Sequence, residues 1–231
     1  MSSKSKSASK YVDDLFDSAR ERTSDTINPF SYWVLKGKIA AGEYPGNQFS
    51  KKPSTFITSV VHSVIALLKS RFAARNSPDW KIGQLMDSGV DTFIDLTESG
   101  ERPPYNMYLH RQRRKRSRRS EYYRFPIPDK NVTTLEQMKE ILDLIDSEVF
   151  EGRSVYIHCF RGLGRTGIVV GCLLSRHGLV GEKALNRIPE MRKGVAGDFR
   201  KSPENEAQRS FVVNWGELDI SPLLKDRSSI T

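Results

Sequence analysis

Residues 154–167 read SVYIHCFRGLGRTG, an apolar run followed by a glycine-containing loop and the start of a second apolar run. The short run at 154–158 predicts a buried β-strand, and the longer run that continues to Gly178 predicts a helix. Cys159 therefore lies where a strand ends and a helix begins. Because open α/β sheets bind ligands at the carboxyl ends of their strands, this position predicts a functional cysteine rather than a core cysteine.

Strands and helices alternate on both sides of this loop. The predicted fold class is therefore α/β, a single compact domain with a mixed, largely parallel central sheet flanked by helices. A β-hairpin is expected in SYWVLKGKIAAGEYP (31–45), which turns at Lys36-Gly37. Further strands are expected at 92–96, 122–127 and 154–158, and helices at 78–88, 133–149, 165–178, 181–192 and 203–215, the last with Ser202 as its cap.

The two ends of the chain and one internal segment differ from this pattern. Residues 1–28 are rich in Ser, Lys and Asp and predict a mostly flexible arm with a short helix. Apolar residues at near-helical spacing predict a helical insertion at about 50–77, packed on the domain; an amphipathic membrane-surface segment is the alternative. Residues 218–231 are interpreted as a tail, which leaves 29–217 as the folded domain.

The composition is that of a globular protein with a core, because 37% of the 231 residues are hydrophobic and 28% are charged. No apolar run approaches the roughly 18 residues of a membrane span, and MSSKSKSASK at the N-terminus lacks an apolar signal core. We therefore expect a cytoplasmic protein, with the nucleus as a second location. The spacing of Cys159 and Cys172 favours neither a disulfide nor a metal site.

The segment HRQRRKRSRRS, residues 110–120, holds seven Arg or Lys and no acidic residue, so most of the net charge of +9 is concentrated there. Such a local run argues against a protein whose whole surface binds nucleic acid. Like charges repel one another unless anions gather nearby, so we interpret the run as a docking segment for an acidic or polyanionic partner or as a nuclear import signal. A solvated surface is the alternative. Because the strand at 122–127 follows directly, we expect the segment on the same side of the domain as Cys159.

The loop after Cys159 has the features of a phosphate cradle. Gly162 and Gly164 permit the backbone to curl so that successive N–H groups point inward. The N-terminus of the following helix adds partial positive charge, and Arg165 offers two N–H groups to two phosphate oxygens. The same field lowers the pKa of a cysteine thiol from about 8.5 into the ~3.5–7.5 range. A thiolate beneath a bound phosphate is placed for in-line attack and formation of a phosphocysteine.

HCFRGLGRTG resembles the phosphate-binding loop of the cysteine-dependent protein tyrosine phosphatases, specifically the dual-specificity branch, and within it the loop of the kinase-associated phosphatase. The resemblance in element order covers residues 30–48 and 78–215. It implies a dual-specificity phosphatase fold for the domain at 29–217, with Cys159 as the nucleophile. The residues that it assigns to phosphate binding are Phe160, Arg161, Gly162, Leu163, Gly164 and Arg165.

The chemistry also requires a general acid, because a departing alkoxide or phenoxide must be protonated. Asp129 in FPIPD lies 30 residues before Cys159. Pro126 and Pro128 precede it and stiffen its loop, and the helix at 133–149 follows. We interpret Asp129 as this acid; the alternative is a solvated turn residue. The spacing between Asp129 and Cys159 matches that of the family which the loop resembles.

The resemblance implies weaker roles for four other residues. Thr166 is expected to donate a hydrogen bond to the leaving thiolate, and His158 to orient the loop. Gln208 is expected to position the hydrolytic water, with a plain surface glutamine as the alternative. Glu98 is a further candidate for the pocket wall.

The predicted function is hydrolysis of phosphotyrosine in proteins, extended to phosphoserine and phosphothreonine, through a phosphocysteine intermediate and without a metal or cofactor. Two other enzymatic hypotheses stay open. A phosphoinositide phosphatase is suggested by Arg161 inside the loop, and an RNA 5′-phosphatase by the arginine run. A non-catalytic phosphoprotein-binding module is a fourth hypothesis, which the intact Cys159, Arg165 and Asp129 disfavour. The physiological substrate and the oligomeric state are not predicted.

Overall fold

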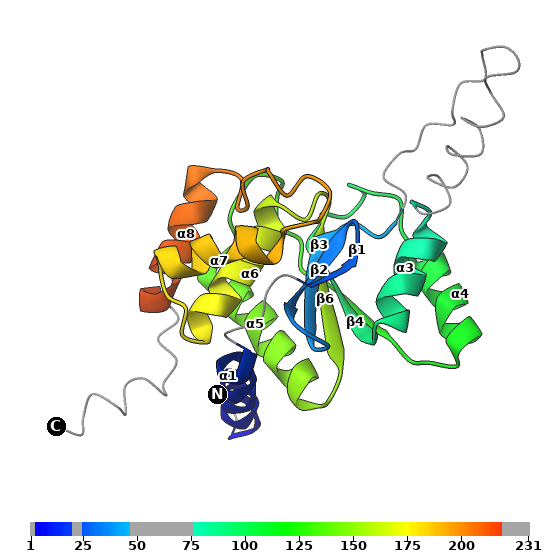
Figure 1. The fold of residues 1–231 in the computed structure, drawn as a ribbon, viewed down its shortest axis with the longest axis horizontal. Helices are drawn as coiled ribbons and strands as arrows, with labels where there is room; N and C mark the ends of the chain where they lie inside the picture. The colour runs from blue at the N-terminus through cyan, green and yellow to red at the C-terminus, as the bar shows by residue number, and fades with distance from the viewer. Residues whose placement is uncertain (1–2, 20–24, 47–75, 219–231) are drawn as a thin grey trace, which may run out of the picture.

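A six-stranded sheet forms the centre of the molecule (Figure 1). The computed structural model describes residues 3–19, 25–46 and 76–218. The strand order is β1-β2-β3-β6-β4-β5, in which β3, β6, β4 and β5 run parallel and β1 and β2 are antiparallel additions at one edge. The predicted α/β fold with a mixed, largely parallel sheet is confirmed. The strands are β1 (Thr26–Asn28), β2 (Ser31–Leu35), β3 (Ile39–Glu43), β4 (Val90–Asp95), β5 (Glu121–Arg124) and β6 (Ser154–Cys159).

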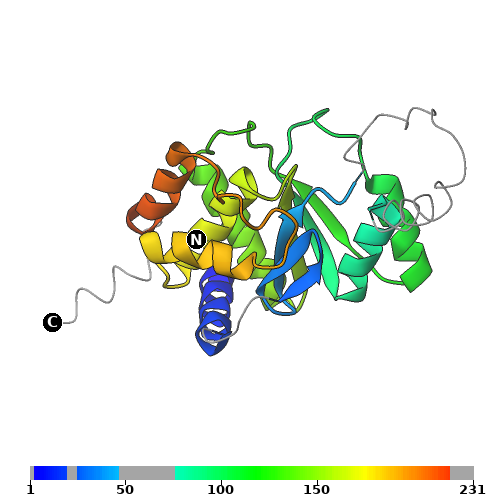
Figure 2. The ribbon, with the colours of Figure 1, turned by 45° about the horizontal axis from the view of Figure 1, so that its top comes forward.

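Helices cover both faces of this sheet, as Figures 1 and 2 show. Helices α3 and α4 lie on one face, and α1, α5, α6, α7 and α8 lie on the other. The described helices are α1 (Ser3–Ala19), α3 (Pro78–Asp87), α4 (Asn106–Arg116), α5 (Leu135–Phe150), α6 (Gly164–Arg176), α7 (Glu182–Met191) and α8 (Glu206–Leu218).

Each face of the sheet has its own hydrophobic core, because successive strand residues point to opposite faces. On β6, Val155 and Ile157 enter the core beneath α5 and α6, whereas Tyr156 enters the core beneath α3 and α4. Ile94 and Phe93 of β4 divide in the same way. The central strands are therefore buried on both sides, which explains their continuous apolar sequences.

The loops that carry function gather at one edge of this sheet. In Figure 2 the segments that follow β4 and β5 lie together along the upper edge of the molecule. The parallel register places Asp95, Arg124 and His158 at the same level, so the residues after these three strands leave the sheet side by side. This is the edge at which α/β sheets bind ligands.

The N-terminal arm differs from its prediction. Instead of a mostly flexible segment, residues 3–19 form helix α1, which packs against α5. Its buried side chains, Ala8, Val12 and Phe16, recur every four residues and join the core. The flanking Ser, Lys and Asp residues hide this thin apolar stripe in the composition. Strand β1 (26–28) also belongs to the sheet, so the folded part of the chain begins before residue 29.

Two further helices differ from the sequence prediction, and two predicted segments lie outside the described residues. Helix α4 was not expected, since its sequence is almost wholly polar and buries only Leu109 and Gln112. Helix α8 begins at Glu206 rather than at Pro203, and Ser202 does not cap it but bonds to the loop after Cys159. The predicted insertion at about 50–77 and the tail after Leu218 lie outside the described residues, apart from the residues that lead into α3. None of the described helices is long and apolar enough to span a membrane.

Candidate active site

The loop after β6 is pressed against the end of β3. The backbone N–H of Tyr44 donates to the carbonyl of Phe160 at 3.1 Å. Gly162 has a φ of +65°, and a Cβ atom there would stand 2.4 Å from the backbone carbon of Gly42. Only glycine satisfies both conditions, because a side chain would be strained and would collide with a neighbouring strand. The loop then passes directly into α6 at Gly164.

Cys159 ends β6 at the floor of a pocket of about 280 Å³. Its side chain is only 3% exposed. The pocket brings together six of the predicted residues from the segments that follow three strands: Glu98 after β4, Asp129 after β5, and Cys159, Phe160, Arg161 and Arg165 at the end of β6 and after it. Its lining residues are Glu98, Glu101, Arg102, Asp129, Lys130, Cys159, Phe160, Arg161, Arg165 and Glu204.

Arg165 is held rigidly although it is part of an open pocket. Its guanidinium is 2% exposed and makes a two-pronged ion pair with Glu101, with N···O distances of 2.6 and 2.7 Å. Nη1 also donates to the carbonyls of Leu96 and Ile127, at 3.4 and 3.1 Å. Burial raises the pKa of Glu101, but the hydrogen bonds from Arg165 and the Glu98 backbone, together with the positive charges of Arg165 and Arg102, outweigh it and the pKa lies below its usual range. The guanidinium plane is thus set by four oxygens before any anion arrives.

Asp129 lies within reach of the same guanidinium. Its Oδ1 accepts from Arg165 Nη2 at 3.1 Å, while the side chain stays 59% exposed. Residues 125–134, the acid loop, are anchored to the strand edge by the N–H of Ile127, which donates to the carbonyl of Leu96. Asn205 donates to the carbonyl of Lys130 at 2.8 Å and fixes the other side of the loop. The Asp129 side chain is therefore accessible from solvent, and its loop is fixed on both sides.

His158 lies behind the pocket and not in it. It is fully buried, and its Nε2 is 2.8 Å from the hydroxyl of Tyr105. Burial lowers the pKa of His158 to about 4, despite the nearby Asp95 carboxylate. The imidazole is therefore neutral near neutral pH and is held by Tyr105 at the start of the loop, and its role in orienting the loop stays a prediction.

Thr166 and Gln208 differ in how their polar atoms are used. The hydroxyl of Thr166 is buried in the first turn of α6 and has no hydrogen-bond partner in the described part of the chain. Gln208 is also fully buried, but its Oε1 accepts from the N–H of Glu204 at 3.0 Å and its Nε2 donates to the carbonyl of Asn131 at 3.1 Å. The Gln208 amide therefore fastens α8 to the acid loop, and Gln208 does not line the pocket.

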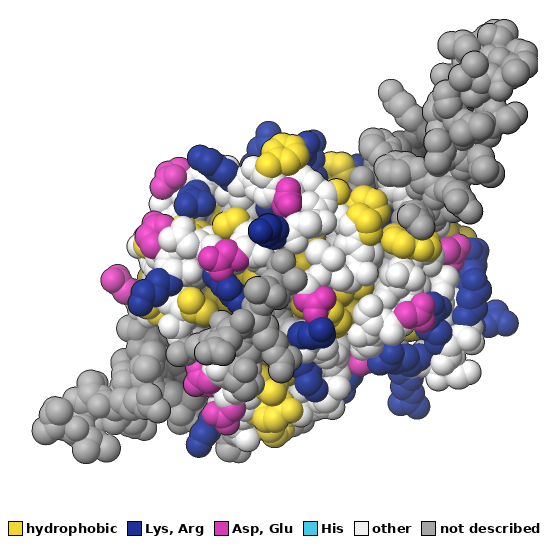
Figure 3. All heavy atoms as spheres, viewed as in Figure 1, with side chains coloured by type: hydrophobic (Ala, Val, Ile, Leu, Met, Phe, Trp, Pro, Cys, Tyr) yellow, Lys and Arg dark blue, Asp and Glu magenta, His cyan; other side chains and the backbone are white. Residues whose placement is uncertain are grey.

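Most of the basic segment is used to hold α4 on the domain. Arg111 pairs with Asp79, Arg116 with Asp87 and Arg118 with Asp91, at 2.5, 2.7 and 2.9 Å. Arg113 donates to Ser120. Arg114, Lys115 and Arg119 are exposed and have no ion pair with other described residues. In Figure 3 Lys and Arg side chains accordingly gather over the α3–α4 side of the molecule.

The location of this segment corrects the sequence prediction. Residues 117–120 lead into Glu121, which pairs with Thr92 near the start of β4, whereas Asp95 and His158 lie at the opposite ends of their strands. The end of the basic segment and Cys159 are therefore on opposite edges of the sheet, because a parallel strand enters at one edge and leaves at the other.

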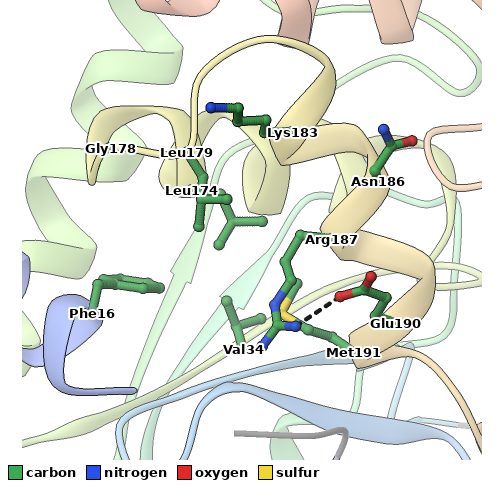
Figure 4. Close-up of a pocket in the computed structure, with 10 residues that line it drawn as sticks. All are labelled: Phe16, Val34, Leu174, Gly178, Leu179, Lys183, Asn186, Arg187, Glu190 and Met191. Atoms are coloured by element: carbon green, nitrogen blue, oxygen red, sulfur yellow. Dashed lines mark hydrogen bonds and ion pairs between the residues drawn. The ribbon is translucent and has the colours of Figure 1, made fainter. Parts of the chain in front are cut away.

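A second pocket, of about 500 Å³, lies between α1, β2 and α7 (Figure 4). Phe16, Val34 and Met191 form its apolar part, and Arg187 is paired with Glu190 at its rim. It lies at the far end of α6 from Cys159 and contains no cysteine or histidine. The candidate active site is therefore the smaller pocket.

Sequence reasoning missed Glu101, Tyr105 and Glu204. Glu101 and Tyr105 lie in an irregular stretch after β4, where no periodic pattern marks one polar residue above another. The only available signal was position, since loops that follow parallel strands converge on the same edge of the sheet.

Comparisons with known proteins match this chain to phosphatases. A family model described as "Polymorphic toxin system, DSP-PTPase phosphatase" matches residues 70–179. The chain is 38% identical over 103 residues to dual specificity protein phosphatase 1 of Arabidopsis thaliana, covering 44% of this chain and 47% of that protein. It is 30% identical over 104 residues to putative tyrosine phosphatase 067L of invertebrate iridescent virus 3, covering 42% of this chain and 40% of that protein. The chain spans about half the length of the curated relatives it matches.

Solved structures share the fold. Tk-PTP in its active form superposes with a TM-score of 0.56 and 22% identity, over 82% of this chain and 97% of Tk-PTP. The kinase associated phosphatase, with its catalytic site cysteine substituted by serine, superposes with a TM-score of 0.54 and 15% identity, over 84% of this chain and 88% of that protein. At these identities the likeness establishes the common architecture.

Proposed function

Because the chain belongs to the cysteine-dependent protein tyrosine phosphatase superfamily, we propose that it removes phosphate from phosphotyrosine, and from phosphoserine and phosphothreonine, in proteins. The observation that carries this proposal is the convergence of Cys159, Arg165 and Asp129 on one pocket. A nucleophile, an anion clamp and an acid are the three groups that phosphomonoester transfer to cysteine requires.

In the first step the thiolate of Cys159 attacks phosphorus, and the bond from phosphorus to the leaving oxygen breaks. The loop N–H groups, the N-terminus of α6 and Arg165 stabilise the phosphate oxygens. Asp129 gives its proton to the leaving oxygen. In the second step water attacks the phosphocysteine, Asp129 takes a proton from it, and the thiolate departs with the hydroxyl of Thr166 as a hydrogen-bond donor.

The pairing of Asp129 with Arg165 links substrate binding to proton transfer. Without substrate, Arg165 Nη2 donates to the Asp129 carboxylate. A bound phosphate competes for that donor and places negative charge beside the carboxylate. Substrate binding therefore releases the Asp129 carboxyl from Arg165, so that the carboxyl can turn to the leaving oxygen.

Phosphoprotein is the substrate class we propose, and lipid and RNA substrates are outcomes of the test. The purified chain is assayed side by side on a phosphotyrosine peptide, a phosphothreonine peptide, a phosphoinositide panel and a 5′-triphosphate RNA. Release of phosphate from the peptides supports the proposal, provided that Cys159→Ser abolishes turnover and still binds the phosphopeptide. Preference for lipid or RNA would reassign the substrate, and Cys159→Ser activity within about tenfold of wild type would exclude the covalent mechanism.

The exposed cations of the basic segment support a separate proposal about partners, docking to an acidic or polyanionic protein. Arg114, Lys115 and Arg119 are the cations left over after α4 is fastened to the domain. Because they lie on the edge opposite Cys159, they would tether a partner without touching the reacting phosphate.

Replacing these three residues by glutamine tests the docking proposal. Binding of the chain to immobilised polyglutamate should weaken, and the remaining binding should depend less on salt. Turnover of a small aryl phosphate should not change. The cytoplasm is the location we propose for the chain, and loss of nuclear entry without loss of polyanion binding would instead identify an import signal. A control with the same charge change replaces three other exposed lysines by glutamine: Lys183, Lys193 and Lys201.

A further inference from the structure

The pocket around Cys159 holds a carboxylate that the chemistry above does not use. Glu204, in the segment between α7 and α8, lines the pocket together with Cys159, Asp129 and Arg165. Arg165 pairs with Asp129 and with Glu101. The Glu204 carboxylate, by contrast, has no hydrogen bond or ion pair to any residue that the structure describes.

Neighbouring hydrogen bonds fix the backbone of Glu204 relative to both catalytic loops. Ser202, two residues earlier, donates to the carbonyl of Leu163 in the loop after Cys159 at 2.8 Å. Asn205, the next residue, donates to the carbonyl of Lys130 in the acid loop at 2.8 Å. Glu204 therefore stands between two anchors, one on the nucleophile side and one on the acid side of the pocket.

The Glu204 carboxylate lies over the first residue of α6. A Cβ atom on Gly164 would stand 2.6 Å from Glu204 Oε2, so the glycine lets the carboxylate lie against the start of α6. The Gln208 amide is the next nearest group, at 2.9 Å, but it is already bonded to the backbone of Glu204 and Asn131. The acceptor presented to the pocket from this segment is therefore the glutamate, and the buried glutamine holds it in place.

We propose that Glu204 orients the water that hydrolyses the phosphocysteine, in the role that the sequence had suggested for Gln208. This inference rests on the proposed phosphatase function. A carboxylate is only a hydrogen-bond acceptor. Water held between Asp129 and Glu204 therefore points one proton at each carboxylate and turns a lone pair toward phosphorus.

In the hydrolytic step Glu204 accepts a hydrogen bond and keeps its charge, because it takes up no proton. The water oxygen forms a bond to phosphorus, and the bond from phosphorus to the sulfur of Cys159 breaks with its electron pair on sulfur. Asp129 accepts one water proton, and the hydrogen bond to Glu204 holds the other. The products are inorganic phosphate, the thiolate and a protonated Asp129 ready for the next substrate.

The charges around the pocket allow a second carboxylate beside phosphate. Four cations and four carboxylates line it, and the N-terminus of α6 adds partial positive charge. Glu101 is already paired with Arg165, so the other three cations offset part of the negative charge of Glu98, Asp129, Glu204 and the bound phosphate. The four cations are Arg102, Lys130, Arg161 and Arg165.

Pre-steady-state kinetics on an aryl phosphate separate formation of the phosphocysteine from its hydrolysis. In Glu204→Gln the burst of aryl alcohol should keep its rate within about twofold of wild type and reach one equivalent per active site. Decay of the trapped ³²P-labelled phosphocysteine should slow at least about tenfold. Methanol, which competes with water for the intermediate, should yield a larger share of methyl phosphate, because the neutral amide accepts more weakly than the carboxylate and can turn a donating N–H group toward the water.

Two controls separate the role of Glu204 from a structural effect. Glu206→Gln, which changes an exposed glutamate two residues further on, should match wild type in burst, decay and methanol partition. Gln208→Ala should slow the burst as well as the decay, because it loosens the acid loop. Wild-type decay in Glu204→Gln, or an equal loss in burst and decay rates, would overturn the assignment and leave the phosphatase proposal intact. A wild-type chain that forms no phosphocysteine would overturn both.

Discussion

The pocket edge and the α3–α4 face are both built around arginine–carboxylate pairs, yet the pairs have different consequences. Arg165 is buried and held by Glu101 beside a concave loop that can accept an anion. Arg116 is partly exposed and paired with Asp87, where its guanidinium joins two helices. The richest run of positive charge in the chain thus serves largely to attach a helix. Under the proposed function, binding of phosphate depends on Arg165, whose surroundings form a cradle.

The largest effect should come from removing the acid at the pocket edge. Asp129→Asn should lower kcat on a phosphotyrosine peptide by about 10²–10⁴, because the leaving oxygen is no longer protonated. On an aryl ester with a good leaving group the loss should be much smaller. Stopped-flow assays of both substrates check this, and an equal loss on both would move the acid role to another carboxylate of the pocket.

A smaller loss should follow when the pair that sets the arginine plane is weakened. Glu101→Gln should reduce kcat/KM by about 10–100-fold, since a misplaced anion clamp stabilises the transition state less well. The matched change at the other face, Asp87→Asn, should leave kcat/KM unchanged. If both variants or neither lose activity, the contrast between the two regions fails.

A third charged cluster joins α1 to the domain and should respond to pH. His177 is buried between Asp13 and Asp146, at 2.5 and 3.0 Å, and Arg176 also contacts Asp146. Burial lowers the pKa of His177, but the hydrogen bonds to Asp13 and Asp146 outweigh it and the pKa is raised above 6.5.

The raised pKa fixes the sign of the effect. The charged His177 stabilises the fold fully below pH 6.5, and this contribution is lost as pH rises through the folded-state pKa. His177→Gln should therefore reduce the free energy of unfolding by about 2 kcal/mol at pH 5.5 and by less at pH 9. Urea titrations of both proteins at several pH values test this, and a difference that grows with pH would contradict it.

The smallest effect should be seen on the α3–α4 face. Arg116→Gln should lower the free energy of unfolding by about 0.2–1 kcal/mol, because the ion pair with Asp87 is largely solvated. That corresponds to a fall in Tm of no more than about 4 °C. Aryl phosphatase activity per folded molecule should be unchanged. Thermal melts and activity assays of the same sample check both statements, and a loss of activity would show that α4 acts on the pocket.

Particular residues show what the sequence alone predicts and what it does not. Cys159, Gly162 and Arg165 were predictable, because a buried strand, a glycine turn and a helix start are local features with a short period. The place of Asp129 in the pocket was predictable, because the chemistry demanded an acid and the stiff loop before the helix offered one; its role as that acid stays a prediction. The packed helix α1 was not predictable, because its narrow apolar stripe is buried only through contact with a face of α5 that is distant in the sequence.

By itself the sequence determined the α/β class, the strand–loop–helix around Cys159 and the parts of a phosphate cradle, since these depend on neighbours within a few residues. Tertiary structure decided which charges remain available. Arg111, Arg116 and Arg118 are paired with aspartates 27 to 32 residues away, and the Gln208 amide is bonded to two backbone groups. Glu204 is presented to the pocket only because α8 docks over α6. A side chain's chemistry is a property of its sequence, but whether that chemistry is free depends on partners that only folding brings within hydrogen-bond distance.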